Sequence, residues 1–377
     1  MVFVLLENAM ANGLSPIEQL GKSIFFDQNL SINQNQSCAA CHAPEVGWTG
    51  PDESINLHGA VYEGSIPGSF GDRKPPSSAY ATQSPILHFL RKQMWVGGNF
   101  WDGRATGEKL GNPAADQAQG PFLNPMEQAL PDPASVVCRV LNPAVPGDYP
   151  VSYQSVWGDP EISCPPSSPE DFAKVNQAYD NIALSIAAYE ASSEVNAFTS
   201  KFDYSRKGMA KLTKQEQKGF ALFQGKGKCA RCHVSSGQKP LFTDYTYDNL
   251  GIPKNSENPV YEYNPGFIDP GLGGYLKAAG YPAAVYGAQW GKFKVPTLRN
   301  VDKRPAEVFV KAYGHNGYFK SLEEIVHFYN TRDVASWPAP EVAANLNTKE
   351  VGNLGLKPEE EAAIVAFLKT LSDGYMP

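Results

Sequence analysis

The chain has 377 residues, 42% of them hydrophobic, and a formal net charge of −7. This length fits two domains, each with a hydrophobic core of its own. No basic patch indicates nucleic-acid binding, and no stretch approaches the roughly 20 apolar residues that a membrane-spanning helix needs.

The chain begins with a short apolar segment, residues 1–6, followed by Ala9 and Ala11. This arrangement resembles the end of a secretory signal with a small-x-small cleavage site, although it lacks a basic region before the apolar one. A truncated signal and a merely apolar N-terminal segment both fit the pattern.

The first predicted helix covers residues 18–25, where apolar residues recur at helical spacing behind Ser15, a typical N-terminal cap. Soon after it, residues 38–42 read Cys-Ala-Ala-Cys-His. This is the attachment pattern of a c-type haem. Two thiols form thioether bonds to the porphyrin, and the adjacent histidine becomes the proximal iron ligand.

The same order recurs in the second half of the chain. Residues 216–223 predict a second amphipathic helix behind Thr213, and residues 229–233 read Cys-Ala-Arg-Cys-His. An internal repeat of this size indicates domain duplication. Zinc sites and disulfides are the alternatives, but zinc requires a further Cys or His pair near each motif, and neither motif has one. The predicted haem-binding residues are Cys38, Cys41 and His42 in the first motif and Cys229, Cys232 and His233 in the second.

Each half also ends in a predicted helix. In the first half Tyr179, Ile182 and Ile186 recur at helical spacing, and in the second half residues 364–371 do the same behind Pro358. An N-terminal helix, a haem-binding turn and a packed C-terminal helix together form the plan of cytochrome c.

We therefore predict a mainly α fold of two tandem cytochrome c-like domains, residues 12–200 and 201–377, each with one covalently bound haem. The linker is expected near residues 192–212, where the apolar period fades. The 34 glycines and 31 prolines predict long loops around the haems and little sheet. Residues 136–140 are only a weak match to a strand.

The haem motifs use four of the six cysteines and leave Cys138 and Cys164. Because bacteria attach c-type haem outside the cytoplasmic membrane, we expect a periplasmic or secreted protein. In such an oxidising compartment the two remaining cysteines are candidates for a disulfide, with two unpaired thiols as the alternative.

Further short segments follow one another in a recognisable order. They are residues 100–105 (FWDGRA), 117–121 (QAQGP), 124–127 (NPME), 294–300 (KVPTLRN) and 321–324 (SLEE). Together with the two haem motifs, this order resembles the bacterial di-haem cytochrome c peroxidase family, which includes the MauG-type enzymes. The resemblance runs from about Ser15 to Leu371. It implies that the N-terminal haem is the peroxide site and that the C-terminal haem accepts or stores electrons.

The resemblance also implies roles for three side chains. Glu127 corresponds to the distal acid–base residue beside the N-terminal haem, and Gln117 to a second polar contact to the bound oxygen. Moving a proton between the two peroxide oxygens requires a carboxylate within hydrogen-bond reach and with a tuned pKa. Trp101 corresponds to the tryptophan between the two haems, where an indole shortens the electron's step. An ordinary solvated glutamate and a core tryptophan are the alternatives.

The sixth ligand of the C-terminal haem departs from the common family pattern. Where many members have a methionine, residues 312–317 read Ala-Tyr-Gly-His-Asn-Gly, with Gly314 in the methionine position. MauG-type enzymes use a tyrosinate, so the resemblance makes Tyr313 the first candidate ligand, followed by His315 and a vacant position. The alternative is that Tyr313 only packs and bonds through its hydroxyl.

Three further positions, His58, Lys74 and Gly227, are compared with the corresponding residues of the family. His58 lies near the place of a displaceable histidine ligand in resting peroxidases, but its sequence context fits a surface loop better. Lys74 replaces the asparagine that binds calcium in the family, and an ammonium cannot ligate a cation. The resemblance therefore does not carry calcium over to this chain, and we expect the charge of Lys74 to take the place of the ion. Gly227 stands where MauG has its exit tryptophan.

The leading functional prediction is an enzyme of the cytochrome-c peroxidase type. It would reduce hydrogen peroxide to water at the N-terminal haem, with electrons entering through the C-terminal haem from a small cytochrome c or cupredoxin. One alternative is a MauG-type enzyme that uses a high-valent iron state to oxidise residues of a partner protein. The absent methionine favours this alternative, whereas the absent exit tryptophan argues against a close copy of MauG.

A second alternative is an electron carrier with two six-coordinate haems. The segment from Gln117 to Glu127 argues against it, because a carrier needs no acid–base pair beside the iron. Family members are often dimers, and the sequence does not fix the oligomeric state.

Overall fold

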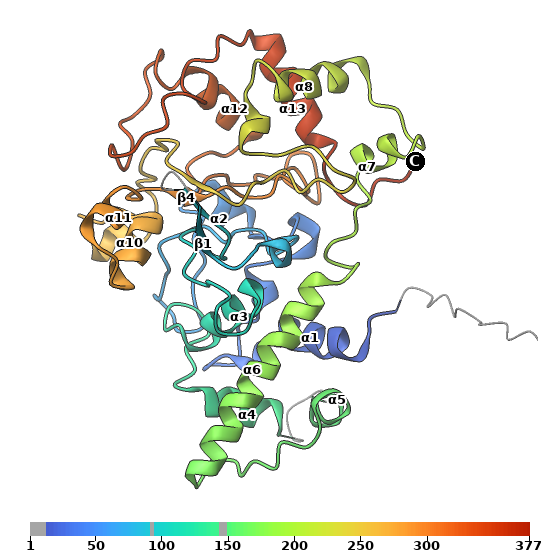
Figure 1. Cartoon of the computed structure of the whole chain (residues 1–377), viewed down its shortest axis with the longest axis vertical. Helices are drawn as coiled ribbons and strands as arrows, with labels where there is room; N and C mark the ends of the chain where they lie inside the picture. Colours follow the sequence, from blue (N-terminus) through green and yellow to red (C-terminus); the bar gives the residue numbers. More distant parts are fainter. Residues whose placement is uncertain (1–12, 91–93, 143–148) are drawn as a thin grey trace, which may run out of the picture.

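The computed structural model describes residues 13–90, 94–142 and 149–377. The apolar N-terminal segment and the proposed domain start at residue 12 lie outside these residues. Figure 1 shows one group of helices around α6 in the lower part of the molecule and a second group around α8 and α13 in the upper part. No helix in the described residues is long and apolar enough to cross a membrane.

Helices dominate both halves of the chain. Those of the first half are α1 (Pro16–Phe26), α2 (Glu53–Leu57), α3 (Pro113–Leu123), α4 (Pro133–Val140), α5 (Tyr149–Trp157) and α6 (Pro169–Ala191). Those of the second half are α7 (Lys201–Arg206), α8 (Lys214–Gln224), α9 (Val260–Tyr263), α10 (Gly271–Ala278), α11 (Ala283–Gly287), α12 (Leu322–Thr331) and α13 (Pro358–Lys369).

Strands are few within the described residues, as the sequence predicted. Two short antiparallel pairs form: β1 (His88–Leu90) with β2 (Met94–Val96), and β3 (Tyr247–Asp248) with β4 (Phe293–Lys294). The predicted mainly helical fold is thus confirmed. Irregular segments connect the helices and carry most of the residues that line the two large cavities described below.

The predicted repeat is visible as two equivalent helix crossings. Helix α1 packs against α6, and α8 packs against α13. A Cβ atom added to Gly21 would lie 1.9 Å from the carbonyl oxygen of Ser185, and one added to Gly219 would lie 1.8 Å from that of Ala363. Only glycine permits such a close approach of two backbones, so both halves depend on the same small residue at the same place in the repeat.

The two N-terminal helices of the repeat also begin in the same way. The amide of Ser15 donates to the Glu18 carboxylate at 2.7 Å, and the amide of Thr213 donates to the Glu216 carboxylate at 2.6 Å. These are the reciprocal contacts of a capping box. The helix starts that the sequence indicated at Ser15 and Thr213 are confirmed.

Residues 136–140 are helical rather than extended. They belong to α4, where Pro133 occupies the first turn and the Asp132 carboxylate accepts a hydrogen bond from the amide of Ser135 at 2.7 Å. Val136, Val137 and Val140 are buried in the first core at helical spacing. The N-terminal cap and the packing of the valines therefore outweigh their preference for strands.

The segment expected as a linker, residues 192–212, also contributes to the core. It contains α7, whose Phe202 and Asp203 are buried. Ser200 and Asp203 form a capping box that starts this short helix. The apolar period fades here because the helix is only six residues long.

Cys138 and Cys164 form a disulfide, which confirms the pairing favoured by the sequence. The bond joins α4 to the segment that precedes α6. The alternative of two unpaired thiols is excluded.

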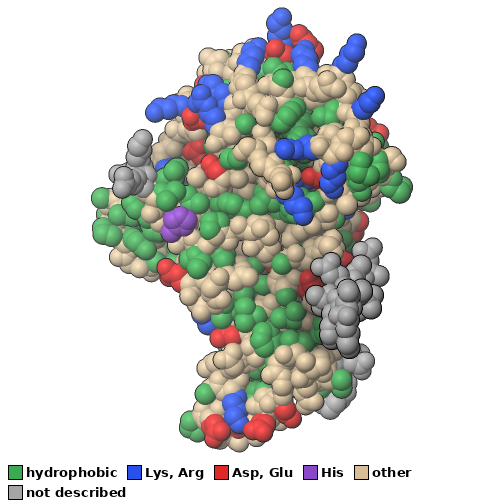
Figure 2. All heavy atoms as spheres, turned by 45° about the vertical axis from the view of Figure 1, so that its right-hand side comes forward, with side chains coloured by type: hydrophobic (Ala, Val, Ile, Leu, Met, Phe, Trp, Pro, Cys, Tyr) green, Lys and Arg blue, Asp and Glu red, His purple; other side chains and the backbone are tan. Residues whose placement is uncertain are grey.

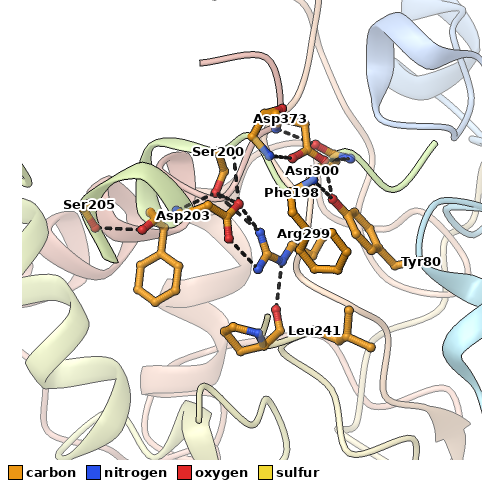
Figure 3. Close-up of polar contacts among 12 residues, drawn as sticks. Tyr80, Phe198, Ser200, Asp203, Ser205, Leu241, Arg299, Asn300 and Asp373 are labelled. Atoms are coloured by element: carbon orange, nitrogen blue, oxygen red, sulfur yellow. Dashed lines mark hydrogen bonds and ion pairs between the residues drawn. The ribbon is translucent and has the colours of Figure 1, made fainter. Parts of the chain in front are cut away.

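A buried ion pair and a tyrosine connect distant parts of the chain (Figure 3). The Arg299 guanidinium donates to the Asp203 carboxylate at 2.6 and 3.0 Å and to the carbonyl of Pro240 at 2.8 Å. Nearby, the Tyr80 hydroxyl of the first half donates to Asp373, close to the C-terminal end, at 2.6 Å. The Tyr80–Asp373 hydrogen bond joins the two halves, whereas the Arg299–Asp203 pair connects distant segments within the second half.

We expect Asp203→Asn to destabilise the protein strongly, because it leaves the Arg299 guanidinium buried without a counter-charge. The exposed fractions of the Arg299 and Asp203 side chains are 0% and 5%. Breaking such a buried pair costs about 3–5 kcal/mol of the free energy of unfolding. Chemical denaturation of the haem-containing protein measures this loss.

The matched control is Glu194→Gln, which removes an ion pair with Lys22 of the same 2.6 Å length but with side chains 42% and 43% exposed. An exposed pair contributes about 0–1 kcal/mol. Equal losses in the two variants would contradict the importance of the Arg299–Asp203 pair.

Candidate active site

Two large cavities lie in the structure, and each is lined by one Cys-x-x-Cys-His motif. The first has a volume of about 240 Å³, and the second about 230 Å³. All the predicted haem-binding residues face them: Cys38, Cys41 and His42 the first, and Cys229, Cys232 and His233 the second.

Each motif forms one tight 3₁₀ turn that points its three functional side chains into the same space. The turns span Cys38–Ala40 and Cys229–Arg231. The amide of His42 donates to the carbonyl of Cys38 at 3.0 Å, and the amide of His233 donates to that of Cys229 at 2.9 Å. The repeated sequence therefore produces the same local geometry twice.

The two histidines are prepared as neutral nitrogen ligands. Nδ1 of His42 donates to the carbonyl of Trp48 at 3.2 Å, and Nδ1 of His233 donates to that of Phe242 at 2.7 Å. Because a carbonyl only accepts, the proton lies on Nδ1 and the Nε2 lone pair is left for a metal. Burial lowers the pKa of His42 to about 4 and also lowers that of His233. This donor set fits the iron of a haem next to paired thiols.

The first cavity contains the predicted acid–base pair. Gln117 lies on α3, whose start is capped by the Asn112 side chain, which accepts from the amide of Ala114 at 2.9 Å. Glu127 follows that helix in a turn closed by its own amide, which donates to the carbonyl of Asn124 at 2.9 Å. Burial raises the pKa of Glu127, an effect that the positive charge of Arg104 partly offsets. The structure thus brings both residues to the cavity of the first motif.

Trp101 lines both cavities and forms part of the wall between them. Its indole Nε1 donates to the carbonyl of Lys74 at 2.8 Å. Its own carbonyl accepts from the amide of Lys294, on β4, at 2.8 Å. Segments from both halves of the chain therefore fix the position of the indole.

The second cavity is lined by both sixth-ligand candidates. The Tyr313 hydroxyl donates to the carbonyl of Val301 at 3.2 Å, and burial raises its pKa. The His315 ring stacks on Phe293 at 3.6 Å, and its Nε2 lies 3.4 Å from a carboxylate oxygen of Glu341. Nδ1 of His315 is buried and has no hydrogen-bond partner among the described residues.

His58 and Lys74 have very different environments. The His58 side chain is exposed, lies 3.5 Å from the Glu257 carboxylate and does not line the first cavity. This position matches the surface-loop interpretation. Lys74 is buried and lines both cavities.

Glu190 is a cavity residue that the sequence analysis missed. It lies on α6, lines the first cavity and is 3% exposed. Its backbone carbonyl accepts from the Asn196 side chain at 2.9 Å, but its carboxylate has no hydrogen bond or ion pair within the described residues. In the repeat its place is taken by Leu368, since Tyr189 and Phe367 contact the two equivalent glycines. Aligning the two halves of the sequence would have revealed Glu190, because it places a carboxylate where the other half has the apolar Leu368.

The fold, with one motif-lined cavity in each half, is that of the di-haem peroxidase class. A family model described as di-haem cytochrome c peroxidase matches residues 15–211. The chain belongs to this family, as its sequence motifs predicted, and is therefore an oxidoreductase.

Relatives with both kinds of name are found. The methylamine utilization protein MauG of Paracoccus denitrificans is 34% identical over 372 residues, which cover 94% of this chain and 88% of the relative. The cytochrome-c peroxidase IdrP1 of Denitromonas iodatirespirans is 28% identical, covering 94% and 80%. The crystal structure of the diheme peroxidase BthA from Burkholderia thailandensis has a TM-score of 0.79 at 28% identity, covering 96% and 87%.

We expect Glu190→Gln to change how stability depends on pH. Burial raises the pKa of Glu190 from 4.5 to about 8, so the folded state holds this proton while the unfolded state releases it. Stability of the wild type is therefore lost as the pH rises between these values. The wild type loses this stability as the pH rises and the variant does not. The difference in free energy of unfolding, variant minus wild type, should therefore increase by roughly 2–4 kcal/mol from about pH 5 to pH 8.

Denaturation curves of the haem-containing protein at both pH values provide the measurement. Glu170→Gln is the control, because Glu170 lies on the same helix with an exposed side chain. If the curves of Glu190→Gln and wild type shift in parallel with pH, the Glu190 carboxyl is not the source of the dependence.

Proposed function

We propose that the chain reduces hydrogen peroxide to water at the first cavity, with one c-type haem in each cavity. The thiols of each motif would hold the haem covalently, and His42 and His233 would bind the two irons. When bound, the haems supply the redox centres through which electrons reach the peroxide. The net reaction consumes one peroxide, two electrons and two protons and yields two water molecules.

The observation that carries this proposal is the asymmetry between the two cavities. Glu127 and Gln117 lie together in the wall of the first cavity and are absent from that of the second. The Glu127 carboxylate takes a proton from one peroxide oxygen and returns it to the other. Because burial raises its pKa, the carboxyl exchanges protons nearer to neutral pH than an exposed glutamate does. The Gln117 amide orients the oxygen.

Electrons would enter through the second cavity and pass the wall at Trp101. Trp101 lines both cavities; its indole is fixed by the hydrogen bond to the carbonyl of Lys74, and its backbone by the hydrogen bond from the amide of Lys294. This division assigns the peroxide site to a domain of residues 12–200 and the electron-transfer site to a domain of residues 201–377. The disulfide between Cys138 and Cys164 supports a periplasmic or secreted location.

A small cytochrome c or cupredoxin is the proposed electron donor. Exposed basic residues gather on α7, α8 and the loop between them: Arg206, Lys207, Lys211, Lys214 and Lys218. Figure 2 shows Lys and Arg side chains concentrated over the upper part of the molecule. A donor with an acidic face would complement this surface and associate faster at low ionic strength.

A MauG-type reaction, the oxidation of residues in a partner protein, is the second candidate function. The second cavity favours it, because Tyr313 and His315 line the cavity where many peroxidases have a methionine. The 34% identical relative is itself named MauG. The electron-carrier alternative is weaker, because a carrier gives no role to Glu127 and Gln117 in one cavity.

Peroxide consumption by the di-haem protein with a reduced cytochrome separates these functions. Fast turnover supports the peroxidase. A slow reaction with a long-lived oxidised species and loss of aromatic residues in an added protein supports the MauG-type function. If the protein does not react with peroxide, the electron carrier is the remaining alternative.

We expect Glu127→Gln to lower the rate of peroxide reduction by roughly 10²–10⁴-fold, the usual contribution of a positioned proton-transfer group. Stopped-flow mixing of the reduced enzyme with peroxide measures the rate directly. Glu45→Gln, which changes an exposed glutamate close to the first motif, should leave it unchanged. A Glu127→Gln enzyme as fast as wild type would remove Glu127 from the mechanism.

We expect Tyr313→Phe to change the optical and magnetic spectra of the C-terminal haem and to leave those of the N-terminal haem unchanged. This follows if the Tyr313 oxygen is the sixth ligand. Tyr329→Phe is the matched control, because Tyr329 lines the same cavity. Unchanged spectra in Tyr313→Phe would rule out Tyr313 as the ligand and leave two alternatives: His315, whose Nδ1 has no hydrogen-bond partner among the described residues, and a vacant position.

A further inference from the structure

Two buried lysines line the second cavity and have no negative partner among the described residues. Lys74 and Lys311 are 7% and 5% exposed. Lys74 lines both cavities, and Lys311 lines the second. In the part of the chain that the structure describes, neither ammonium forms an ion pair with a carboxylate. Burying a charged group without a counter-charge is costly. A bound anion beside the two ammonium groups would offset this cost.

Each of these ammonium groups retains an unused donor. Nζ of Lys74 donates to Thr49 Oγ1 at 2.7 Å and to the carbonyl of Pro75 at 2.9 Å. Nζ of Lys311 donates to the carbonyls of Asn300 and Lys303 at 2.8 and 3.0 Å. Since an ammonium has three N–H groups, one is left on each lysine.

A third lysine in the same wall is different. Lys294 also lines both cavities, but its ammonium donates to Ser84 Oγ at 2.9 Å, to Asn99 Oδ1 at 2.8 Å and to the carbonyl of Gly98. All three of its N–H groups are used by the protein. Lys294 therefore contributes charge to the wall but offers no donor to a ligand.

The charges around the lysine pair do not neutralise it. Burial lowers the pKa of Lys74 to about 7, and burial together with the charge of Lys74 lowers that of Lys311. Asp302, the acidic group near Lys311, is bound to Arg304 at 2.8 Å, and Lys303 adds a further positive charge.

The other acidic groups of the second cavity are bound elsewhere. Glu350 is bound to Arg231 at 3.1 Å. Asp248 accepts a hydrogen bond from the Asn347 amide, forms no ion pair among the described residues and is not among the charges that act on Lys74 or Lys311.

Arg299 is bound to Asp203 at 2.6 Å, and Glu341 lies 3.4 Å from His315. None of these groups is free to neutralise the two ammonium groups.

We propose that Lys74 and Lys311 together bind a propionate carboxylate of the haem in the second cavity through their unused N–H groups, and so raise the reduction potential of that haem. This inference rests on the proposed presence of a haem there. A haem carries two propionates, whose carboxylates match the charge and the donors that the pair offers. The positive charges oppose the added positive charge of the oxidised iron and thereby favour the reduced state.

The experiment uses the holoprotein with haem labelled with ¹³C at the propionates. Redox-induced infrared difference spectra report the propionate carboxylates, and potentiometric titration reports each haem. In Lys311→Gln and Lys74→Gln we expect an altered propionate band and a shift of the C-terminal haem to lower potential. We also expect a steeper pH dependence of that potential, because a propionate without its ammonium partners takes up a proton more readily.

Lys294→Gln is the matched control, since it removes a charge from the same wall but no ligand donor. It should lower the potential and leave the propionate band unchanged. Lys74→Arg and Lys311→Arg keep the charge and should retain a potential near that of wild type if the glutamine variants fold poorly.

The outcomes separate this inference from the proposed function. Two bound haems with propionate bands and potentials unchanged in both glutamine variants would overturn the role of the lysine pair alone. A wild-type protein that binds no haem at the second motif would overturn the inference and the proposed di-haem function together.

Discussion

The wall between the two cavities is the feature on which the proposed chemistry depends. Trp101 forms part of it: its indole donates to the carbonyl of Lys74, and its backbone carbonyl accepts from the amide of Lys294. These partners come from different halves of the chain, so the indole keeps its place only while the halves stay docked. The Tyr80–Asp373 hydrogen bond joins the two halves directly, and the buried Arg299–Asp203 pair stabilises the second half. A loss of docking would therefore separate the two redox sites as well as destabilise the protein.

The two halves share a scaffold but differ in the walls of their cavities. The glycine crossings at Gly21 and Gly219 and the two motif turns are equivalent. The first cavity adds the carboxylates of Glu127 and Glu190, whereas the second adds Tyr313 and His315. Duplication thus supplied two similar sites, and the loops and single substitutions on the repeated helices gave their cavities different linings, on which the proposed division into a peroxide site and an electron-transfer site is based.

Desolvation acts on buried groups of both signs around the cavities. It raises the pKa of the Glu127 and Glu190 carboxyls and lowers the pKa of the Lys74 and Lys311 ammonium groups. In each case the charged form is disfavoured because few polar groups surround it. A charged cofactor that binds in such a site changes the pKa most for a group that can still form a hydrogen bond to it. Lys74 and Lys311 each retain an unused N–H group for this purpose, whereas Lys294 does not.

The sequence by itself determined the family, the mainly helical fold and the repeated helices, because each depends on local spacing or on residue type. It favoured the Cys138–Cys164 disulfide but left unpaired thiols open, and the structure decided for the bond. Residues 136–140 match a strand only weakly, and they form a helix because Asp132 caps its start and the valines pack into the core. Only the tertiary structure placed Glu190 and the Lys74–Lys311 pair at the cavities and left Tyr313 and His315 in the same wall. Their roles depend on which groups lie nearby and how far water is excluded, and both come from contacts between residues distant in the chain.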